Sequence, residues 1–300
     1  MGAAAARGPD MKVSTALKLG RVSNLPTVWT NTLAGAVLGG AAAFGASLAV
    51  MLAAFTLFYV GGMFLNDAFD AGWDALERPE RPIPSGEVGR TEVYGAGFAQ
   101  LGLGVLLLGW VGQGFEPSTG ARPLLAGLAL AGMITLYNGW HKGNPLSPLL
   151  MGLCRVLVYA GAAWCVARVL PAPLWIGAAL LLCYLIGLTY IAKQENLGEI
   201  ANLWPLLFLG APVLYGLWLA TRDPIVLPFW LLFVAWTLVA LAFLKRRRRG
   251  DIPRAVVSLI AGISLLDAML IAAAGATGLA VWALAGFGVT LFLQRYVAGT

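Results

Sequence analysis

Ten long apolar segments are the feature that most constrains the fold of this 300-residue chain. A helix needs about 20 mostly apolar residues to cross a lipid bilayer, and the segments have about this length. They lie near residues 25–44, 46–66, 92–113, 122–139, 148–170, 173–192, 201–220, 225–244, 253–275 and 277–294. Charged residues make up only 11% of the chain, whereas soluble domains have roughly a quarter. The chain is therefore predicted to be an integral membrane protein.

The apolar segments indicate helices rather than the strands of a membrane barrel. Barrel strands alternate apolar and polar residues, but stretches such as 174–188 and 226–244 are almost entirely apolar. The 38 glycines suit membrane helices that approach closely. We expect an all-α, polytopic bundle of nine or ten transmembrane helices. It forms one domain over residues 22–296, after a cytoplasmic N-terminal tail of residues 1–21.

The basic residues predict the orientation of the chain in the membrane. A net charge of +6 would suggest nucleic acid as a partner of a soluble protein. Here, however, Lys and Arg gather in the N-terminal tail and in every second connection, including the run 245–249. The other side holds only Arg122, Arg168 and Arg222. The positive-inside rule then places the N-terminus in the cytoplasm. We expect a multi-pass plasma (inner) membrane protein with lipids, and no nucleic acid, as partners.

Half of the 14 acidic residues lie in or beside the connection between the second and third apolar segments. Among them, Asp67, Asp70 and Asp74 are spaced to share one face of a helix, about one turn apart. Like charges placed in this way repel each other unless a cation neutralises them. Carboxylate oxygens suit Mg²⁺, which binds one or two carboxylates together with substrate phosphates. The spacing predicts a Mg²⁺ site, and a solvated acidic loop is the alternative.

The residues around the aspartates suit a phosphate ligand. Asn66 precedes them with an amide group, and three prolines in the stretch 77–86 end the helix. Arg78 and Arg81 each directly precede a proline, and guanidinium groups make bidentate contacts with phosphate oxygens. These residues predict that a phosphorylated substrate binds beside the metal ion.

Residues 66–86, NDAFDAGWDALERPERPIPSG, resemble the first motif of the UbiA superfamily of intramembrane prenyltransferases. Residues 21–31, RVSNLPTVWTN, are similar to the signature of that family's first helix. The resemblance implies that Mg²⁺, held between two acidic motifs, binds an isoprenyl diphosphate at the cytoplasmic end of the bundle. It also implies an apolar tunnel for the lipid tail. Loss of diphosphate would leave an allylic carbocation, which an acceptor, often aromatic, attacks.

The second acidic motif is expected after the sixth apolar segment, where residues 189–199 read TYIAKQENLGE. Glu195 and Glu199 again share one helical face, on the same predicted side of the membrane as the aspartates. The family's pattern is DxxxD, whereas this chain has ExxxE, and glutamate can still bind Mg²⁺. Lys193 is expected to contact the diphosphate. The alternative is a surface helix that begins with glutamates in its first turn.

Residues 136–145, LYNGWHKGNP, resemble a segment with Tyr and Lys that the family places beside the diphosphate. The resemblance assigns catalytic roles to Tyr137 and Lys142, whose ammonium group would stabilise the departing diphosphate. An interfacial belt of Tyr137, Trp140 and Lys142 is the alternative. The single histidine, His141, is predicted to fill space at the interface rather than to act as a base.

Two ionisable residues fall inside apolar segments, where a charge is costly and therefore indicates a function. Arg155 lies near the cytoplasmic end of its segment, within expected reach of the diphosphate. Asp267 is expected to pair with Arg155 or Ser264. For both residues, structural pairing inside the bundle is the alternative to catalysis.

The predicted function is Mg²⁺-dependent transfer of an isoprenyl group from a prenyl diphosphate to an acceptor that is hydrophobic or aromatic. The altered second motif leaves open a non-catalytic protein that binds prenyl lipids. A transporter coupled to protons or cations would need charged residues along a path through the middle of the membrane. It is disfavoured because the acids cluster at the ends of the apolar segments.

Overall fold

The computed structural model describes residues 11–42, 44–194, 204–246 and 248–297, and this part of the chain contains helices and no β-strand. A short helix, α1 (Val13–Leu19), precedes ten longer ones among the described residues. These are α2 (Pro26–Leu38), α3 (Ala46–Glu77), α4 (Arg90–Gly114), α5 (Arg122–Trp140), α6 (Ser147–Trp164), α7 (Ala172–Gln194), α8 (Gly210–Arg222), α9 (Leu227–Arg246), α10 (Asp251–Ala273) and α11 (Thr277–Leu293). Short 3₁₀ helices occupy Val22–Asn24, Trp204–Leu209 and Pro224–Val226.

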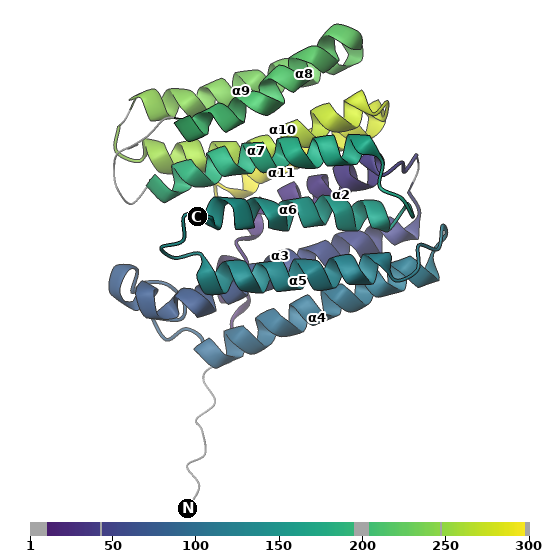
Figure 1. The fold of residues 1–300 in the computed structure, drawn as a ribbon. Coiled ribbons are helices and arrows are strands. Elements are labelled where there is room, and N and C mark those ends of the chain that lie inside the picture. Colours follow the sequence, from purple (N-terminus) through teal and green to yellow (C-terminus); the bar gives the residue numbers. More distant parts are fainter. Residues whose placement is uncertain (1–10, 43, 195–203, 247, 298–300) are drawn as a thin grey trace, which may run out of the picture.

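The long helices lie side by side with their axes roughly parallel (Figure 1). Helix α4 lies at one edge of the bundle, followed by α3 and α5, then α6 and α2. Helices α7, α10 and α11 come next, and α8 and α9 form the opposite edge. The connection after α3 and the turn between α5 and α6 emerge at the same end of the bundle (Figure 1).

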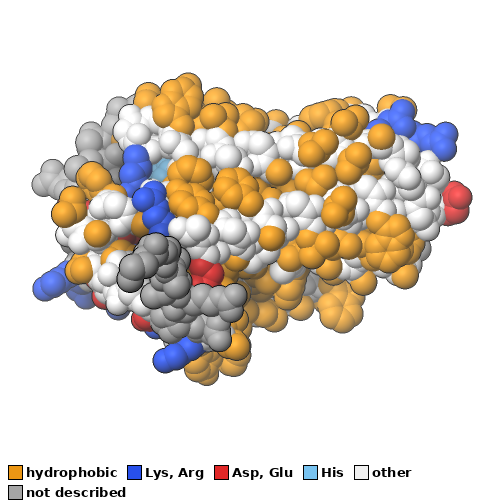
Figure 2. Space-filling view, turned by 90° about the horizontal axis from the view of Figure 1, so that it is seen from below, with side chains coloured by type: hydrophobic (Ala, Val, Ile, Leu, Met, Phe, Trp, Pro, Cys, Tyr) orange, Lys and Arg blue, Asp and Glu red, His pale blue; other side chains and the backbone are white. Residues whose placement is uncertain are grey.

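Seven helices of the described part are long and apolar enough to cross a membrane. They are α3 to α7, α10, and α9 with the 3₁₀ turn before it, while residues 207–222 and α11 form shorter apolar helices. Hydrophobic side chains cover the middle of the molecule, and charged side chains lie toward its two ends (Figure 2). The all-α membrane fold is therefore confirmed. The number of nine or ten spans is not confirmed, and the single domain over 22–296 stays a prediction.

Helix α3 carries the acidic motif because it is much longer than one membrane crossing. Its 32 residues span about 48 Å, whereas the apolar core of a bilayer is about 30 Å thick. The apolar segment near 46–66 fills one crossing, and the acidic turns continue the helix to Glu77. Arg78 leaves the helical conformation because Pro79 follows it. The proline run thus ends the helix, as the sequence predicts.

Glycines bring α2 against α6, backbone to backbone. A Cβ atom added at Gly35 would lie 2.6 Å from the carbonyl oxygen of Tyr159, and one at Gly39 would lie 2.8 Å from Cα of Ala163. Only glycine allows such an approach.

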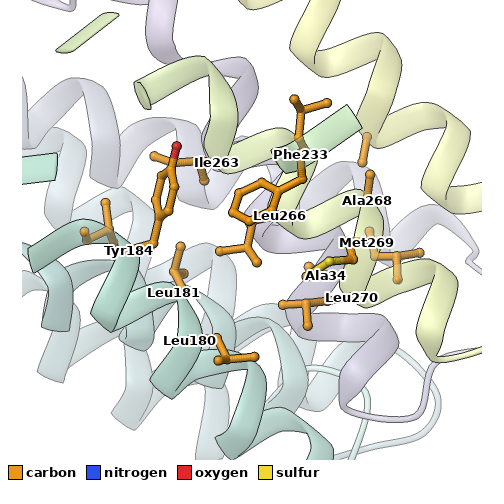
Figure 3. Packing of buried hydrophobic residues seen from close by; sticks show 14 of the residues in the cluster. Ala34, Leu180, Leu181, Tyr184, Phe233, Ile263, Leu266, Ala268, Met269 and Leu270 are labelled. Carbon is orange, nitrogen blue, oxygen red and sulfur yellow. The ribbon is translucent and has the colours of Figure 1, made fainter. Parts of the chain in front are cut away.

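Helix α10 is almost wholly buried at the centre of the second half of the bundle. Its Leu266 and Met269 pack with Phe233 of α9, near Tyr184 of α7 and Ala34 of α2 (Figure 3). The rings of Tyr184 and Phe233 lie 5.7 Å apart between their centroids. This core holds α10 against α2, and α2 in turn reaches the end of the bundle where the acidic motif lies.

Candidate active site

Three aspartates on the last turns of α3 form the acidic part of the site. The side chains of Asp67 and Asp74 are almost completely buried, and that of Asp70 is 13% exposed. Each carboxylate contacts at least one basic side chain from another segment. The site is therefore a cluster of paired charges at one end of the bundle.

Arg81 joins two of the aspartates. Its Nη1 atom lies 2.9 Å from Oδ2 of Asp74 and 3.4 Å from Oδ1 of Asp67. Because one guanidinium contacts both carboxylates, Asp67 and Asp74 share one helical face, as their spacing predicts. The segment after the proline run folds back along α3, and this return brings Arg81 to the acids.

Arg21 is the second arginine of the site. Its Nη2 atom lies 3.1 Å from Oδ1 of Asp67 and 3.2 Å from Oδ1 of Asn66. Its backbone has φ 41° and ψ 48°, in the left-handed region, and its carbonyl oxygen accepts a hydrogen bond from Tyr59. Sequence reasoning assigned no role to Arg21. The only signal was its position as the first residue of the stretch RVSNLPTVWTN.

Asn66 uses both ends of its amide group within the protein. Its oxygen accepts from Arg21, and its Nδ2 donates to Asn138 of α5 at 3.1 Å. Asn138 donates in turn to the carbonyl oxygen of Gly62 at 3.0 Å. Asn66 thus holds Arg21 and joins α3 to α5. These bonds fix the position of the aspartates along α3 relative to α5.

Asp70 faces the turn between α5 and α6. Lys142 places Nζ 3.1 Å from its Oδ1 atom, and His141 places Nε2 3.4 Å from its Oδ2 atom. The ring of His141 also stacks on Tyr137, with centroids 5.1 Å apart. The structure thus brings Tyr137 and Lys142 to the acidic motif. His141 was predicted only to fill space, but it contacts a site carboxylate.

Arg155 lies deeper in the bundle and forms no hydrogen bond or ion pair with Asp67, Asp70 or Asp74. It donates to Oδ1 of Asn31 at 2.8 Å and to Oγ1 of Thr27 at 3.1 Å. Asn31 donates to Asp267 at 2.8 Å, and Tyr159 donates to the other oxygen of the same carboxylate.

The expected direct partners of Asp267 are therefore corrected by the structure. Asn31 stands between Asp267 and Arg155, because its amide can accept from the arginine while donating to the acid. Ser264 instead accepts a hydrogen bond from Thr30. The result is a polar network that joins α2, α6 and α10.

Part of the predicted site is not among the contacts that the structure describes. Glu195, Glu199 and the side chain of Lys193 lie outside the described residues, so the second acidic motif stays a prediction. Arg78 is half-buried and forms no ion pair with any residue that the structure describes. Its expected contact with a phosphate also stays a prediction.

The aspartates fit Mg²⁺ in their chemistry, since all three offer carboxylate oxygens, the ligands that this ion prefers. Among the described residues, however, no three His, Cys, Asp or Glu side chains form a group that could hold a metal ion. The carboxylates instead contact Arg21, Arg81, His141 and Lys142. Basic side chains from other segments thus supply neutralising charge to the three aspartates, and spacing within one helix does not predict such partners.

Comparison with known proteins gives a family match. The model of the UbiA prenyltransferase family matches residues 27–199. Digeranylgeranylglyceryl phosphate synthase from Ignicoccus hospitalis is 35% identical over 167 residues, 53% of this chain and 53% of that protein. Chlorophyll synthase from chloroplasts of Oryza sativa subsp. japonica is 33% identical over 104 residues, 30% of this chain and 26% of that protein. The matches thus span about half or less of each relative.

Two solved structures share the fold over most of the chain. A UbiA homologue from Aeropyrum pernix has a TM-score of 0.63 at 16% identity, covering 84% of this chain and 97% of that one. A structure of digeranylgeranylglyceryl phosphate synthase has a TM-score of 0.62 at 18% identity, covering 87% and 98%. At these identities, the likeness shows a common fold.

Proposed function

Because the chain belongs to the UbiA prenyltransferase family, we propose that it transfers an isoprenyl group from a prenyl diphosphate to an acceptor that is hydrophobic or aromatic. The observation that carries the proposal is the convergence of Arg21, Arg81 and Lys142 on the aspartates of α3. Such a cluster can bind a diphosphate with arginine and lysine while its carboxylates keep the bases in place.

The bases are suited to hold the leaving group. Arg81 and Arg21 present planar guanidinium groups that match phosphate oxygens, and Lys142 adds a point charge. Aspartates already fix each of these side chains, so less conformational freedom is lost when a phosphate binds. Arg78 and Lys193 supply further cations in the proposed site, and Asn66 orients Arg21.

The acids are suited to hold a metal ion. Asp67, Asp70 and Asp74 would bind Mg²⁺ together with Glu195 and Glu199 of the second motif. When bound, Mg²⁺ supplies positive charge that stabilises the departing diphosphate.

The residues of the site act where charge develops during the reaction. As the bond between the allylic carbon and the phosphate oxygen breaks, its electron pair leaves with diphosphate, beside Lys142 and the arginines. The acceptor then donates an electron pair to the allylic cation and loses a proton. Tyr137 stacks on His141, the residue before Lys142. Arg155 donates hydrogen bonds to α2, the long helix that comes after Arg21 in the chain, and so supports it.

The proposal places the site on the cytoplasmic face of the plasma membrane, with the N-terminus on the same side. The support is the distribution of Lys and Arg, which gather in the N-terminal tail and in alternate connections.

The direct test is turnover by purified protein in nanodiscs. The assay supplies radiolabelled geranyl, farnesyl and longer diphosphates, Mg²⁺ and a panel of phenolic, naphthoate, porphyrin-derived and glycerol phosphate acceptors. Wild-type protein is expected to release diphosphate and form a labelled product. Asp70→Asn removes the partner of Lys142 and is expected to lower kcat by about 100-fold or more. Asp223→Asn is the matched control, because Asp223 only caps a 3₁₀ turn before α9.

Other outcomes would contradict the proposal. Equal turnover by Asp70→Asn and Asp223→Asn would exclude this carboxylate from the reaction. Binding of prenyl diphosphate without product for any acceptor would favour the non-catalytic protein. Proton flux into liposomes that Asp267→Asn abolishes would favour a transporter.

A further inference from the structure

A hollow runs along the outer surface between α4 and α5, and we name it the α4–α5 groove. It has a volume of about 630 Å³ and is lined on α4 by Phe98, Gly102 and Val105, among others, and on α5 by Leu128, Gly132 and Thr135. Both helices are long and apolar enough to cross a membrane, so the groove faces lipid. A role for this groove does not depend on the proposed transfer of an isoprenyl group.

Two glycines make the groove hollow. A Cβ atom added at Gly102 or at Gly132 would meet no atom within 4 Å, so neither glycine is needed for helix packing. Gly35 and Gly97, by contrast, lie against neighbouring helices. The open space above Gly102 and Gly132 is therefore a surface feature that other residues do not fill.

The lining of the groove favours hydrocarbon. Its one hydroxyl group belongs to Thr135, which donates to the carbonyl oxygen of Ala131 at 2.8 Å. Because this donor is already satisfied within the helix, the groove offers no free polar group to a ligand. An acyl chain matches such a surface, while a hydrated or polar segment does not.

One end of the groove carries a fixed positive charge. Tyr94 stacks on Phe98 with centroids 6.4 Å apart, and the guanidinium carbon of Arg90 lies 5.5 Å from the centroid of Tyr94. Arg90 also donates through Nε to the carbonyl oxygen of Ala68 at 2.8 Å and through Nη2 to Tyr94. Arg90 is exposed, and its Nη1 forms no hydrogen bond or ion pair with the described residues, which leaves donors for an anion.

The distance from Arg90 to the middle of the groove is similar to the thickness of the apolar layer of one leaflet. The twelve residues from Arg90 to Gly102 span about 18 Å along α4, and half of the apolar core of a bilayer is about 15 Å thick. We propose that the α4–α5 groove binds an acyl chain of an anionic phospholipid, whose phosphate contacts Arg90.

The test is retention of lipid by the purified full-length protein. Protein is delipidated, mixed with phosphatidylglycerol or phosphatidylcholine of identical chains, and examined by native mass spectrometry. Wild-type protein is expected to retain the anionic lipid about fivefold better, since one basic residue near a membrane contributes about 1 kcal/mol. Arg90→Gln is expected to remove this preference. Gly102→Leu, and independently Gly132→Leu, are expected to reduce retention of both lipids.

Gly288→Leu on α11 is the matched control, because a Cβ at Gly288 also meets open space. It is expected to retain lipid as wild type does, and circular dichroism checks that every variant is folded. Equal retention by Gly102→Leu, Gly132→Leu and Gly288→Leu would overturn the groove as a lipid site. A dimer that Gly102→Leu dissociates would assign the groove to a second copy of the chain. Displacement of the lipid by prenyl diphosphate would assign it to the substrate tail.

Discussion

Asn31 of α2 donates a hydrogen bond of 2.8 Å to Asp267 of α10, a residue that stands 236 positions further along the chain. The same amide accepts a hydrogen bond from Arg155 of α6, so it gives both the buried acid and the buried base a polar partner. A buried polar group without a partner costs free energy, and a buried charge costs more. The network therefore fixes α2, α6 and α10 relative to one another along the axis of the bundle.

Asn31→Leu is expected to lower the free energy of unfolding by about 3–5 kcal/mol, because it leaves Arg155 and Asp267 buried without their shared partner. Thermal unfolding in detergent measures the change. Thr32→Val is the control on the same helix, since Thr32 donates only to the carbonyl oxygen of Val28 in its own helix. Equal melting temperatures of the two variants would show that the network adds little stability.

Gly35→Ala is expected to destabilise the protein by about 1–3 kcal/mol, because the new methyl group would overlap the backbone of Tyr159 and push α2 from α6. Gly102→Ala adds the same methyl group where space is open, so it is expected to have almost no effect. Unfolding in a denaturant series compares the two variants. A larger loss for Gly102→Ala would contradict the packing of α2 on α6.

Arg21→Gln is expected to raise the KM for prenyl diphosphate by about tenfold or more, since a hydrogen bond to a charged group contributes about 1.5–3 kcal/mol. Arg21→Lys keeps the charge but loses the planar pair of donors, so an intermediate KM is expected. Steady-state kinetics over a range of diphosphate concentrations measures both. Lys12→Gln, at an exposed position before α1, is the control and is expected to match wild type. An unchanged KM in Arg21→Gln would place the diphosphate away from this arginine.

Removal of divalent cations by a chelator is expected to abolish turnover and to leave the melting temperature of the free protein unchanged. Asp74→Asn is then expected to raise the Mg²⁺ concentration for half-maximal rate about tenfold, because a ligand of the metal ion is lost. Lys142→Gln is expected to lower kcat by about 100-fold, with little change in that concentration. Identical Mg²⁺ titrations of Asp74→Asn and wild type would remove Asp74 from the metal site.

Hydrophobic segments predicted the helices of this fold well, since each apolar segment overlaps a helix of the described part. The ends of the helices were harder to predict. Helix α2 ends at Leu38, before the predicted limit at residue 44, because Gly39 is followed by Gly40 with φ 106°. Helix α3 continues eleven residues past its apolar segment, since charged turns prolong a helix without adding hydrophobicity.

Spacing within one helix predicted that Asp67, Asp70 and Asp74 would share a face, since this relation is local, and the shared contact with Arg81 bears this out for Asp67 and Asp74. The partners of these acids could not be predicted in the same way. Arg21 lies 46 positions from Asp67, and Asn31 lies 236 positions from Asp267. Such contacts depend on the path of the chain between helices, which hydrophobic patterns do not describe.

The left-handed backbone at Arg21 carries a strain that the ion pair of this residue outweighs. No other non-glycine residue of the described chain has a positive φ, and this conformation costs most residues about 1–2 kcal/mol. Glycine adopts it freely, but Arg21→Gly would also take the guanidinium from the buried carboxylate of Asp67, 3.1 Å away. Loss of one partner of a buried ion pair costs about 3–5 kcal/mol, which is more than the strain that glycine relieves. A directed-evolution screen for thermal survival is therefore expected to keep arginine at residue 21, although its backbone conformation favours glycine.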